Sequence, residues 1–509
     1  MRRRAGDGGA DTTATPRSAT AWTVIAALAV VGLAGLAVTG CDNEDDGGEM
    51  GPMGEPTFSS TVLPVLQQSC ATTGCHAEPA PSAGLRLDGR AALLAGSDFG
   101  EAVIPYSPER SLMIDMLRGR AASTPDHATL LGESDITAIE SWIGDGCPDD
   151  LGVPAFADVE DKVYVTGQGA DTLSVIGVDD LLVIRTIPVE PFSSGGLFAA
   201  PHFGAVTADG SWIVTLLQAP GVWKFDAGDA VLDRLQTSRP LAALTAVTPD
   251  GSKAYVTHFV IDPGAPGFVT VIDLATLETT SEIQVLYTPH GIAMSPDGSE
   301  VYVANFDSDH ITVIDTATDQ VTTHIPIAER VRGDIGSSSY RILQIATHPT
   351  QPWIYASCTI SPDSPTGEIR VIDRTQGTAI DSLAVAAGSA APWHLKVTPD
   401  GSKLYVANRG QQLMGGAILD GTVSVYSTSP FALLTTITDP SLRLPHGLDF
   451  DADGRYCFVS SENRNGGYTA RHPIDGEDPG VVTVIDTATD QVIKVLEVEA
   501  FATGVFATR

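Results

Sequence analysis

Two cysteines and a histidine form the cluster with the most specific chemistry in this sequence. They are Cys70, Cys75 and His76, arranged as Cys-x4-Cys-His. Two neighbouring thiols can form thioether bonds with the vinyl groups of a haem, and an imidazole directly after the second thiol can bind its iron. The usual spacing places two residues between the cysteines, whereas this sequence places four. The cluster therefore predicts a covalent haem c, attached through Cys70 and Cys75, with His76 as the proximal iron ligand.

A disulfide is the alternative interpretation of these thiols. Cys147 lies in the same segment and could pair with Cys70 or Cys75 in an exported protein. The remaining cysteines of the C-terminal part, Cys358 and Cys457, fall in separate predicted strands. We expect them to be buried, unpaired, small hydrophobic residues.

The first 41 residues have the features of an export signal. Arginines at positions 2–4 precede an uncharged apolar run at 21–38, which is followed by Thr39, Gly40 and Cys41. This ending resembles the lipobox of bacterial lipoproteins, in which Cys41 would be lipidated and become the mature N-terminus. A transmembrane anchor is the alternative, because about 18 apolar residues can just span a bilayer. Both interpretations place the mature chain outside the cytoplasm and fix it to a membrane.

Charge and composition separate the rest of the chain into segments. The net charge of −34 argues against nucleic acid as a partner, because binding a phosphate backbone requires basic stripes. Residues 42–56 are rich in Asp, Glu, Gly and Pro, which predicts an acidic, flexible tether. Residues 57–150 are predicted to form a small, mainly α-helical domain. One helix is expected just before the cysteines, and a second with Ser134 as its N-cap and Gly144 at its end.

Short motifs surround the Cys-His cluster. They are Phe-x-x-x-Val-x-Pro-x-Leu at 58–66, Gly-Leu-Arg-Leu-Asp at 84–88, Ile-Pro at 104–105, Ser-Pro-Glu at 107–109, Ser-Leu at 111–112 and Trp-Ile at 142–143. Together they resemble the cytochrome c-like haem domains that many bacteria attach to secreted proteins. Where that family usually carries Met-Pro, which can supply the sixth iron ligand, this chain has Thr124 and Pro125. We therefore rank His127 first as the distal ligand, then Met116 and Met113, with a five-coordinate iron as a further alternative.

Residues 151–509 repeat a four-strand pattern. An Asp-Gly turn recurs at intervals of about 41 to 53 residues, which suits propeller blades. Its positions are Asp209, Asp250, Asp297, Asp400 and Asp453, with Thr350 in the same place once. The third strand of the unit occurs seven times, at 173–177, 222–226, 269–273, 311–315, 369–373, 423–427 and 482–486. The repeat predicts a seven-bladed β-propeller, closed by pairing 503–507 with the first blade.

Repeats such as Tyr-Val-Ala-Asn at 302–305 and 405–408 resemble the YVTN propeller family. That resemblance implies the fold and says little about function. The predicted fold class is therefore mostly β, a seven-bladed propeller preceded by a small, mainly α domain.

Histidines recur at the start of the first strands. His202, His290 and His446 each follow a proline, whereas His394 is offset by one residue behind Trp393. Imidazoles at the mouth of a propeller channel could bind a transition metal or a second haem. The alternative is that Pro-His-Gly belongs to the repeat itself and each imidazole bonds to a neighbouring blade. The offset predicts that His394 points away from the other three.

Together these features predict a membrane-anchored, extracytoplasmic haem c protein. It would exchange electrons with a redox partner protein of the cell envelope, with the propeller as docking platform. One alternative is a non-redox scaffold lipoprotein whose small domain is stabilised by a disulfide. Another is a propeller oxidoreductase that uses the haem as electron acceptor, by analogy with nitrite reductases that join a haem c domain to a propeller. No catalytic residue is assigned.

Overall fold

The computed structural model describes most of the chain after the predicted tether. The described residues are 57–121, 126–192, 198–260, 262, 265–328, 339–360, 366–384, 391–410, 420–464, 467–470 and 478–508. The predicted signal segment with Cys41, the tether at 42–56, and the pair Thr124 and Pro125 lie outside them. Within these ranges, no helix combines the length and apolarity that crossing a bilayer requires.

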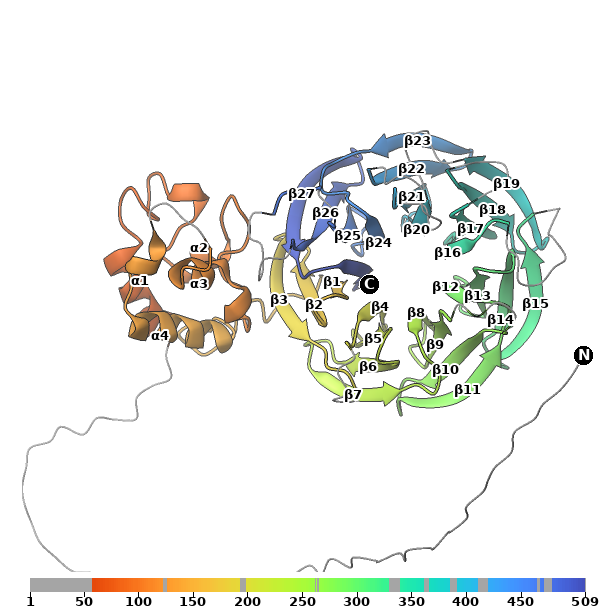
Figure 1. The fold of residues 1–509 in the computed structure, drawn as a ribbon, viewed down its shortest axis with the longest axis horizontal. Coiled ribbons are helices and arrows are strands. Elements are labelled where there is room, and N and C mark those ends of the chain that lie inside the picture. Colours follow the sequence, from red (N-terminus) through yellow and green to blue (C-terminus); the bar gives the residue numbers. More distant parts are fainter. Residues whose placement is uncertain are drawn as a thin grey trace, which may run out of the picture. The chain divides into compact units, whose positions relative to one another are not determined.

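The N-terminal part of the described chain is built from short helices (Figure 1). They are α1 (Leu63–Ser69), α2 (Arg90–Leu94), α3 (Leu112–Leu117) and α4 (Glu133–Gly144), with a π-helical turn at Phe58–Val62 and 3-10 turns at Ser82–Gly84, Pro108–Arg110 and His127–Thr129. One apolar core holds them together, with Val62, Ile139 and Trp142 fully buried. The Trp142 ring lies 5.4 Å from the Phe58 ring, and its Nε1–H donates to the Pro148 carbonyl at 2.9 Å.

Both predicted helices are present in this region. The helix before the cysteines is confirmed, because α1 ends at Ser69 and Cys70 is its C-cap. The predicted N-cap of the later helix is wrong. Helix α4 starts at Glu133 with Gly132 as N-cap, so Ser134 lies inside its first turn. Glu133 and Asp135 place negative charge there, which the helix dipole favours.

Seven four-stranded antiparallel sheets form a ring (Figure 1). Blade 1 contains β28 (Ala502–Ala507), β1 (Lys162–Gly167), β2 (Thr172–Gly177) and β3 (Leu182–Pro188). Blade 2 contains β4 (Pro201–Val206), β5 (Trp212–Leu216), β6 (Gly221–Phe225) and β7 (Val231–Gln236). Blade 3 contains β8 (Ala242–Val247), β9 (Lys253–His258), β10 (Phe268–Asp273) and β11 (Glu278–Gln284). Blade 4 contains β12 (Pro289–Met294), β13 (Glu300–Asn305), β14 (His310–Asp315) and β15 (Gln320–Pro326).

The remaining three blades repeat the same order. Blade 5 contains β16 (Ile342–Thr347), β17 (Trp353–Cys358), β18 (Glu368–Asp373) and β19 (Thr378–Ala384). Blade 6 contains β20 (Pro392–Val397), β21 (Lys403–Asn408), β22 (Thr422–Thr428) and β23 (Phe431–Ile437). Blade 7 contains β24 (Pro445–Phe450), β25 (Tyr456–Ser461), β26 (Gly480–Asp486) and β27 (Gln491–Val498). The predicted fold class, a seven-bladed propeller after a small helical region, is confirmed.

The ring closes by pairing the two ends of the propeller sequence. Strand β28 supplies the innermost strand of blade 1 and pairs with β1, with Tyr164 opposite Phe506 and Val165 opposite Val505. The predicted closure is therefore confirmed. It pairs the inner edge of β1, whose backbone groups would otherwise lack strand partners.

Lysine–aspartate pairs connect successive blades. Lys253 of β9 lies 2.8 Å from Asp319 in the turn between β14 and β15, and the Tyr255 hydroxyl donates to the same carboxylate at 2.5 Å. Lys162 and Asp229 repeat this contact at 3.0 Å, from blade 1 to blade 2. Each contact joins the second strand of one blade to the turn before the outer strand of the next.

The Asp-Gly turns owe their shape to hydrogen bonds from hydroxyl groups. The Asp297 carboxylate accepts from the Ser295 hydroxyl at 2.7 Å, and from the hydroxyl and backbone N–H of Ser299 at 2.8 and 3.1 Å. Gly298 follows with φ of +74°, a conformation that favours glycine. These bonds, that from Ser295 first, lower the pKa of Asp297 to about 2.

We expect Asp297→Ala to destabilise the protein at neutral pH by about 0.5 kcal/mol, a small amount because the carboxylate faces water. The folded-state pKa lies below the ordinary Asp value, so the contribution of Asp297 is complete above about pH 4 and is lost as the pH falls toward 2. Urea unfolding at pH 7 and pH 3 measures the difference. Asp453→Ala is the matched control, because the Asp453 side chain is 79% exposed and its carboxylate lies 3.9 Å from Arg455. An equal loss of unfolding free energy at pH 7 and at pH 3 would show that the ionised Asp297 carboxylate is not the source of the stabilisation.

Candidate functional site

An apolar cavity of about 360 Å³ lies in the helical region. All six residues predicted to attach or ligate a haem line it: Cys70, Cys75, His76, Met113, Met116 and His127. Leucines from α1 and α3, among them Leu66 and Leu112, form part of its wall. The structure therefore brings together the two thiols, the predicted proximal histidine and every distal candidate around one cavity.

The long spacer between the two cysteines folds into a compact turn. The Thr72 N–H donates to the Cys70 carbonyl at 2.8 Å, and the Cys75 N–H donates to the Thr72 carbonyl at 3.0 Å. The His76 N–H then returns to the Cys70 carbonyl at 3.1 Å. Gly74, with φ of +88°, permits the reversal. The turn takes up the two additional residues, so both thiols still line the same cavity.

The thiols differ in their surroundings. Cys70 is buried, which raises the pKa of its thiol, whereas Cys75 is exposed. The five cysteines that the structure describes are unpaired, so Cys147 forms no disulfide with either of them. The expectation for Cys358 and Cys457 is confirmed, since both are fully buried and free.

His76 is held in one orientation by a backbone carbonyl. Its Nδ1 lies 3.3 Å from the Leu85 carbonyl oxygen, which can only accept a hydrogen bond. Nδ1 therefore carries the proton, and Nε2 keeps a lone pair for a metal. Burial lowers the pKa of His76, which keeps the ring neutral at pH 7. A ligating histidine that donates its other N–H to a carbonyl is the usual arrangement in metal sites.

The distal candidates occupy two elements. Met113 and Met116 belong to α3, with Met113 buried in the core and Met116 half-buried. His127 begins the 3-10 turn His127–Thr129, where the Asp126 carboxylate accepts from the Ala128 N–H at 3.1 Å. The imidazole centroids of His127 and His76 lie 6.1 Å apart. Two imidazoles on opposite sides of one metal, with metal–nitrogen bonds of about 2.0 Å, have centroids about 6.3 Å apart. The spacing of the two rings thus fits a bis-histidine haem.

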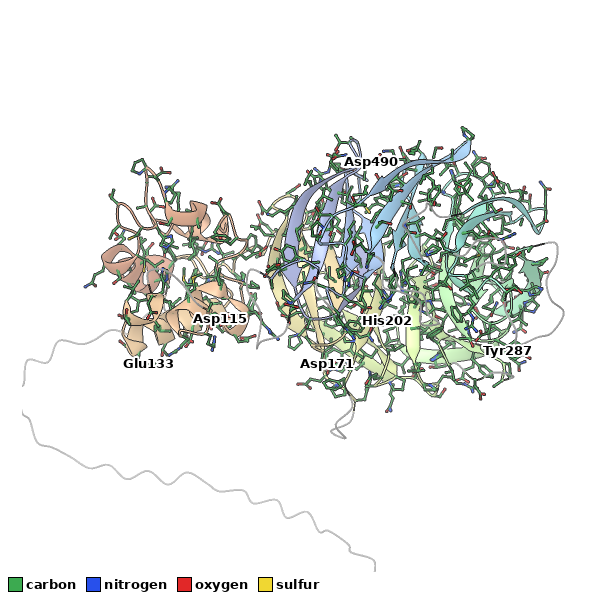
Figure 2. All side chains as sticks on the ribbon, turned by 45° about the horizontal axis from the view of Figure 1, so that its top comes forward. Asp115, Glu133, Asp171, His202, Tyr287 and Asp490 are labelled. Carbon is green, nitrogen blue, oxygen red and sulfur yellow. The ribbon has the colours of Figure 1, made fainter. Side chains whose placement is uncertain are left out.

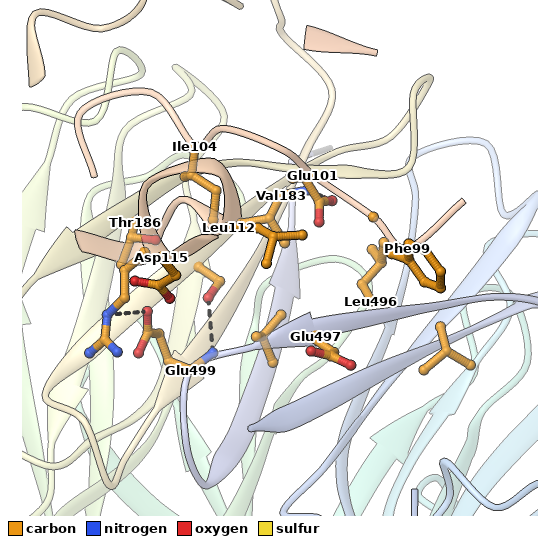
Figure 3. A pocket seen from close by; sticks show the side chains of 15 residues that line it. Phe99, Glu101, Ile104, Leu112, Asp115, Val183, Thr186, Leu496, Glu497 and Glu499 are labelled. Carbon is orange, nitrogen blue, oxygen red and sulfur yellow. Dashed lines mark hydrogen bonds and ion pairs between the residues drawn. The ribbon is translucent and has the colours of Figure 1, made fainter. Parts of the chain in front are cut away.

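A small crevice of about 60 Å³ adjoins this region (Figure 3). Phe99 and Leu112 line both the crevice and the larger cavity. The Val183 N–H of β3 donates to the Glu101 carboxylate at 2.6 Å, and burial raises the pKa of Glu101. Arg110 pairs with Glu499 at 3.1 Å. Residues beside the cavity therefore contact blades 1 and 7. The sequence did not predict these contacts, because the partner residues lie far apart in the chain.

The predicted propeller histidines lie together, and a fourth joins them. Figure 2 marks His202 inside the propeller. Its ring centroid lies 5.4 Å from that of His446 and 6.1 Å from that of His290. The expectation that His394 points elsewhere is wrong, because its ring lies 5.1 Å from His446 and 6.2 Å from His290. His394 lies in a bulge between Pro392 and Leu395, where the regular alternation of side chains is interrupted.

Other histidines near the strand ends have ordinary structural partners. His258 is buried, with Nδ1 2.9 Å from the Pro240 carbonyl and Nε2 2.8 Å from the Thr270 hydroxyl. His310 contacts the Ser308 carbonyl through Nδ1 at 2.5 Å.

The helical region matches a known protein family, and the fold of most of the chain resembles solved structures. Residues 73–124 match the family described as Planctomycete cytochrome C, a segment that contains Cys75, His76 and the two methionines and begins just after Cys70. No curated protein matches. The chain therefore carries a cytochrome c domain near its N-terminus, followed by the propeller.

Solved structures resemble the chain at low sequence identity. A functionally unknown protein from Desulfotomaculum acetoxidans is 15% identical, covers 68% of this chain and 99% of its own, and has a TM-score of 0.51. A putative 6-phosphogluconolactonase from Bacteroides uniformis is 13% identical, with coverages of 69% and 100% and a TM-score of 0.50. Hydrazine synthase from Kuenenia stuttgartiensis is 19% identical, with coverages of 62% and 91% and a TM-score of 0.48. At these identities the likeness concerns the fold alone.

Proposed function

We propose that this protein is a membrane-anchored, extracytoplasmic electron-transfer protein with one covalent haem c, and that the propeller is its docking platform. The observation that carries this proposal is the apolar cavity in which Cys70, Cys75, His76 and His127 meet, with the two imidazoles 6.1 Å apart. A c-type cytochrome domain also implies a location outside the cytoplasm.

Each residue of the cavity has a defined task in this proposal. Cys70 and Cys75 would form the thioether bonds, and the imidazoles of His76 and His127 would bind the iron. The bound haem supplies one-electron exchange. The Leu85 carbonyl fixes the tautomer and orientation of His76 and makes it a stronger ligand. The apolar wall limits access of water, which tunes the redox potential.

Charge and targeting motifs support the remaining parts of the proposal. Lipidation of Cys41 would anchor the mature chain, with residues 42–56 as tether. The redox partner would be another protein of the cell envelope. Because this chain carries a net charge of −34, we expect the partner to present a basic surface, and association to slow as salt screens the attraction.

The mass of the mature protein tests the proposal. The full chain is produced in a bacterium that attaches haem c and exports lipoproteins, and is then purified from membranes. We expect the added mass of one porphyrin, which survives denaturation, and the added mass of a lipid on a chain beginning at Cys41. Absence of the porphyrin mass would overturn the redox function, whereas absence of the lipid alone would overturn only the anchor.

The distal ligand gives a separate prediction. We expect His127→Ala to convert a low-spin, six-coordinate haem into a high-spin form that binds carbon monoxide readily, because one axial ligand is lost. His127→Met should keep the haem low-spin and raise its midpoint potential, since axial methionine raises the potential. Absorption spectra and a redox titration measure both effects.

Met116→Leu is the matched control for the distal ligand, because Met116 lines the same cavity and leucine preserves its bulk. It should leave the spectrum and potential nearly unchanged. A spectrum lost in Met116→Leu and kept in His127→Ala would assign the distal position to Met116.

A further inference from the structure

Four imidazoles gather where the innermost strands of four blades begin. His202, His290, His394 and His446 come from β4, β12, β20 and β24. The centroid distances around the set are 6.1, 6.2, 5.1 and 5.4 Å, so each ring is close to the next and the series closes on itself. All four side chains are almost completely buried. We call these four residues the histidine ring.

Two members of the histidine ring have a defined tautomer. His202 Nδ1 lies 3.0 Å from the Gln168 side-chain oxygen, and His290 Nδ1 lies 3.0 Å from the Leu343 carbonyl oxygen. Both oxygens accept hydrogen bonds, so both Nδ1 atoms carry the proton. Each Nε2 then keeps a lone pair, the arrangement that second-shell acceptors impose on metal-binding histidines.

The other two members have a buried nitrogen without a partner. His394 Nε2 and His446 Nδ1 are both buried and make no hydrogen bond in the described structure. An unsatisfied buried nitrogen costs free energy, and the ordinary solution is the one that His258 shows, with a partner at each nitrogen. Two such nitrogens within one ring of imidazoles indicate a ligand at this place.

We propose that the histidine ring binds one transition-metal ion, through His202, His394 and His446 first and through His290 as a fourth ligand. In a tetrahedral imidazole site with metal–nitrogen bonds of about 2.0 Å, ring centroids are about 5.2 Å apart. His446 meets this spacing with both of its neighbours, at 5.1 and 5.4 Å, whereas His290 lies about an ångström too far out. No set of three or more His, Cys, Asp or Glu among the described residues is already arranged around an ion position. Binding therefore requires the rings to rotate inward.

The residues around the histidine ring suit uncharged ligands, and a cavity gives a metal ion a way in. The oxygens that accept from Nδ1 of His202 and of His290 leave Nε2 of each ring with a lone pair, the form of imidazole that binds a metal. The charge of nearby Arg409 is balanced by its ion pair with Glu462. His394 also lines a cavity of about 680 Å³ between the inner strands, which offers an entry path. Imidazole ligands suit copper and zinc, and Cu²⁺ binds more tightly at equal geometry.

Metal titration of the full-length protein tests this site. The protein is stripped with a chelator, incubated with Cu²⁺ or with Zn²⁺, passed through a desalting column and analysed for copper, zinc and iron separately. We expect one Cu²⁺ per chain, or one Zn²⁺ when zinc alone is offered. The Cu²⁺ form should show hyperfine coupling to several nitrogens in its electron paramagnetic resonance spectrum.

Single substitutions identify the ligands. His446→Ala should weaken Cu²⁺ binding at least a hundredfold, and His290→Ala should weaken it less, because His290 lies further out. His324→Ala is the matched control, since His324 is an exposed histidine on β15 and should keep full binding. Circular dichroism melting confirms that each variant is folded.

Two results would overturn the proposal. One is fewer than about 0.1 Cu²⁺ or Zn²⁺ per wild-type chain after desalting. The other is unchanged copper binding in the folded variant His394→Ala with His446→Ala, which would mean an adventitious ion only. Neither result depends on the haem, because iron is measured separately and the haem residues are left intact.

Discussion

Replacing both Cys70 and Cys75 with alanine is expected to remove all covalently bound haem from the exported protein. No other described thiol lines the cavity, so no thioether bond can form there. The Soret absorbance of the denatured protein, the haem stain on a gel and the porphyrin mass should fall to background. Because the haem would fill the centre of a small helical domain, that domain should also become more sensitive to protease.

The matched control is Cys147→Ala, because Cys147 is fully buried in the same core. Burial raises the pKa of this thiol, so it is a poor nucleophile, and the structure leaves it unpaired. The variant should keep its haem and lose only modest stability. Haem retained in the double variant would show that Cys70 and Cys75 do not attach it. A crosslink from Cys147 to Cys70 or Cys75 in the wild-type protein would replace the haem interpretation with the disulfide.

Replacing Phe506 with alanine is expected to destabilise the propeller by about 3–5 kcal/mol, the usual cost of emptying a buried aromatic site. Phe506 belongs to the closing strand β28 and is 3% exposed. Its ring stacks on Tyr164 at 5.1 Å and lies 5.9 Å from Trp212, so it joins blades 1 and 2. Gly204 of β4 approaches so closely that a Cβ there would lie 2.4 Å from the ring.

Urea unfolding followed by tryptophan fluorescence measures this loss. Ile493→Ala is the matched control, because Ile493 lies on the outer strand β27 and is 47% exposed. It should cost less than about 0.5 kcal/mol. Similar losses in the two variants would show that closure through β28 contributes no special stability. A larger loss in Phe506→Ala together with a lower slope against urea would show that the ring opens before it unfolds.

Part of this protein could be predicted from sequence because the relevant interactions are local. The blade count follows from turns and strands that recur within about 50 residues, and each turn carries its own hydroxyl and carboxylate partners, such as Ser295 and Asp297. The Cys-x4-Cys-His cluster is equally local, because Cys70, Cys75 and His76 share one short turn. Closure by residues 503–507 was also predictable, since the first blade lacks one strand in sequence order.

Other features depend on residues that only the folded chain brings together. His127 was the first-ranked distal ligand, but its 6.1 Å spacing from His76 results from the packing of turns fifty residues apart. His394 was predicted to point away, because a shift of one residue normally reverses a side chain in a strand. The bulge between Pro392 and Leu395 interrupts this alternation, and the His394 ring lies beside that of His446.

The sequence by itself thus determined the repeat, the closing strand and the Cys-x4-Cys-His cluster, since periodic patterns and short loops encode their own geometry. Only the tertiary structure decided which histidines share a space, and that Glu101 accepts a hydrogen bond from Val183. The physical reason is that side chains on different blades and helices meet through the positions of whole elements. These relative positions cannot be predicted from the periodicity or the residue spacing of a single segment.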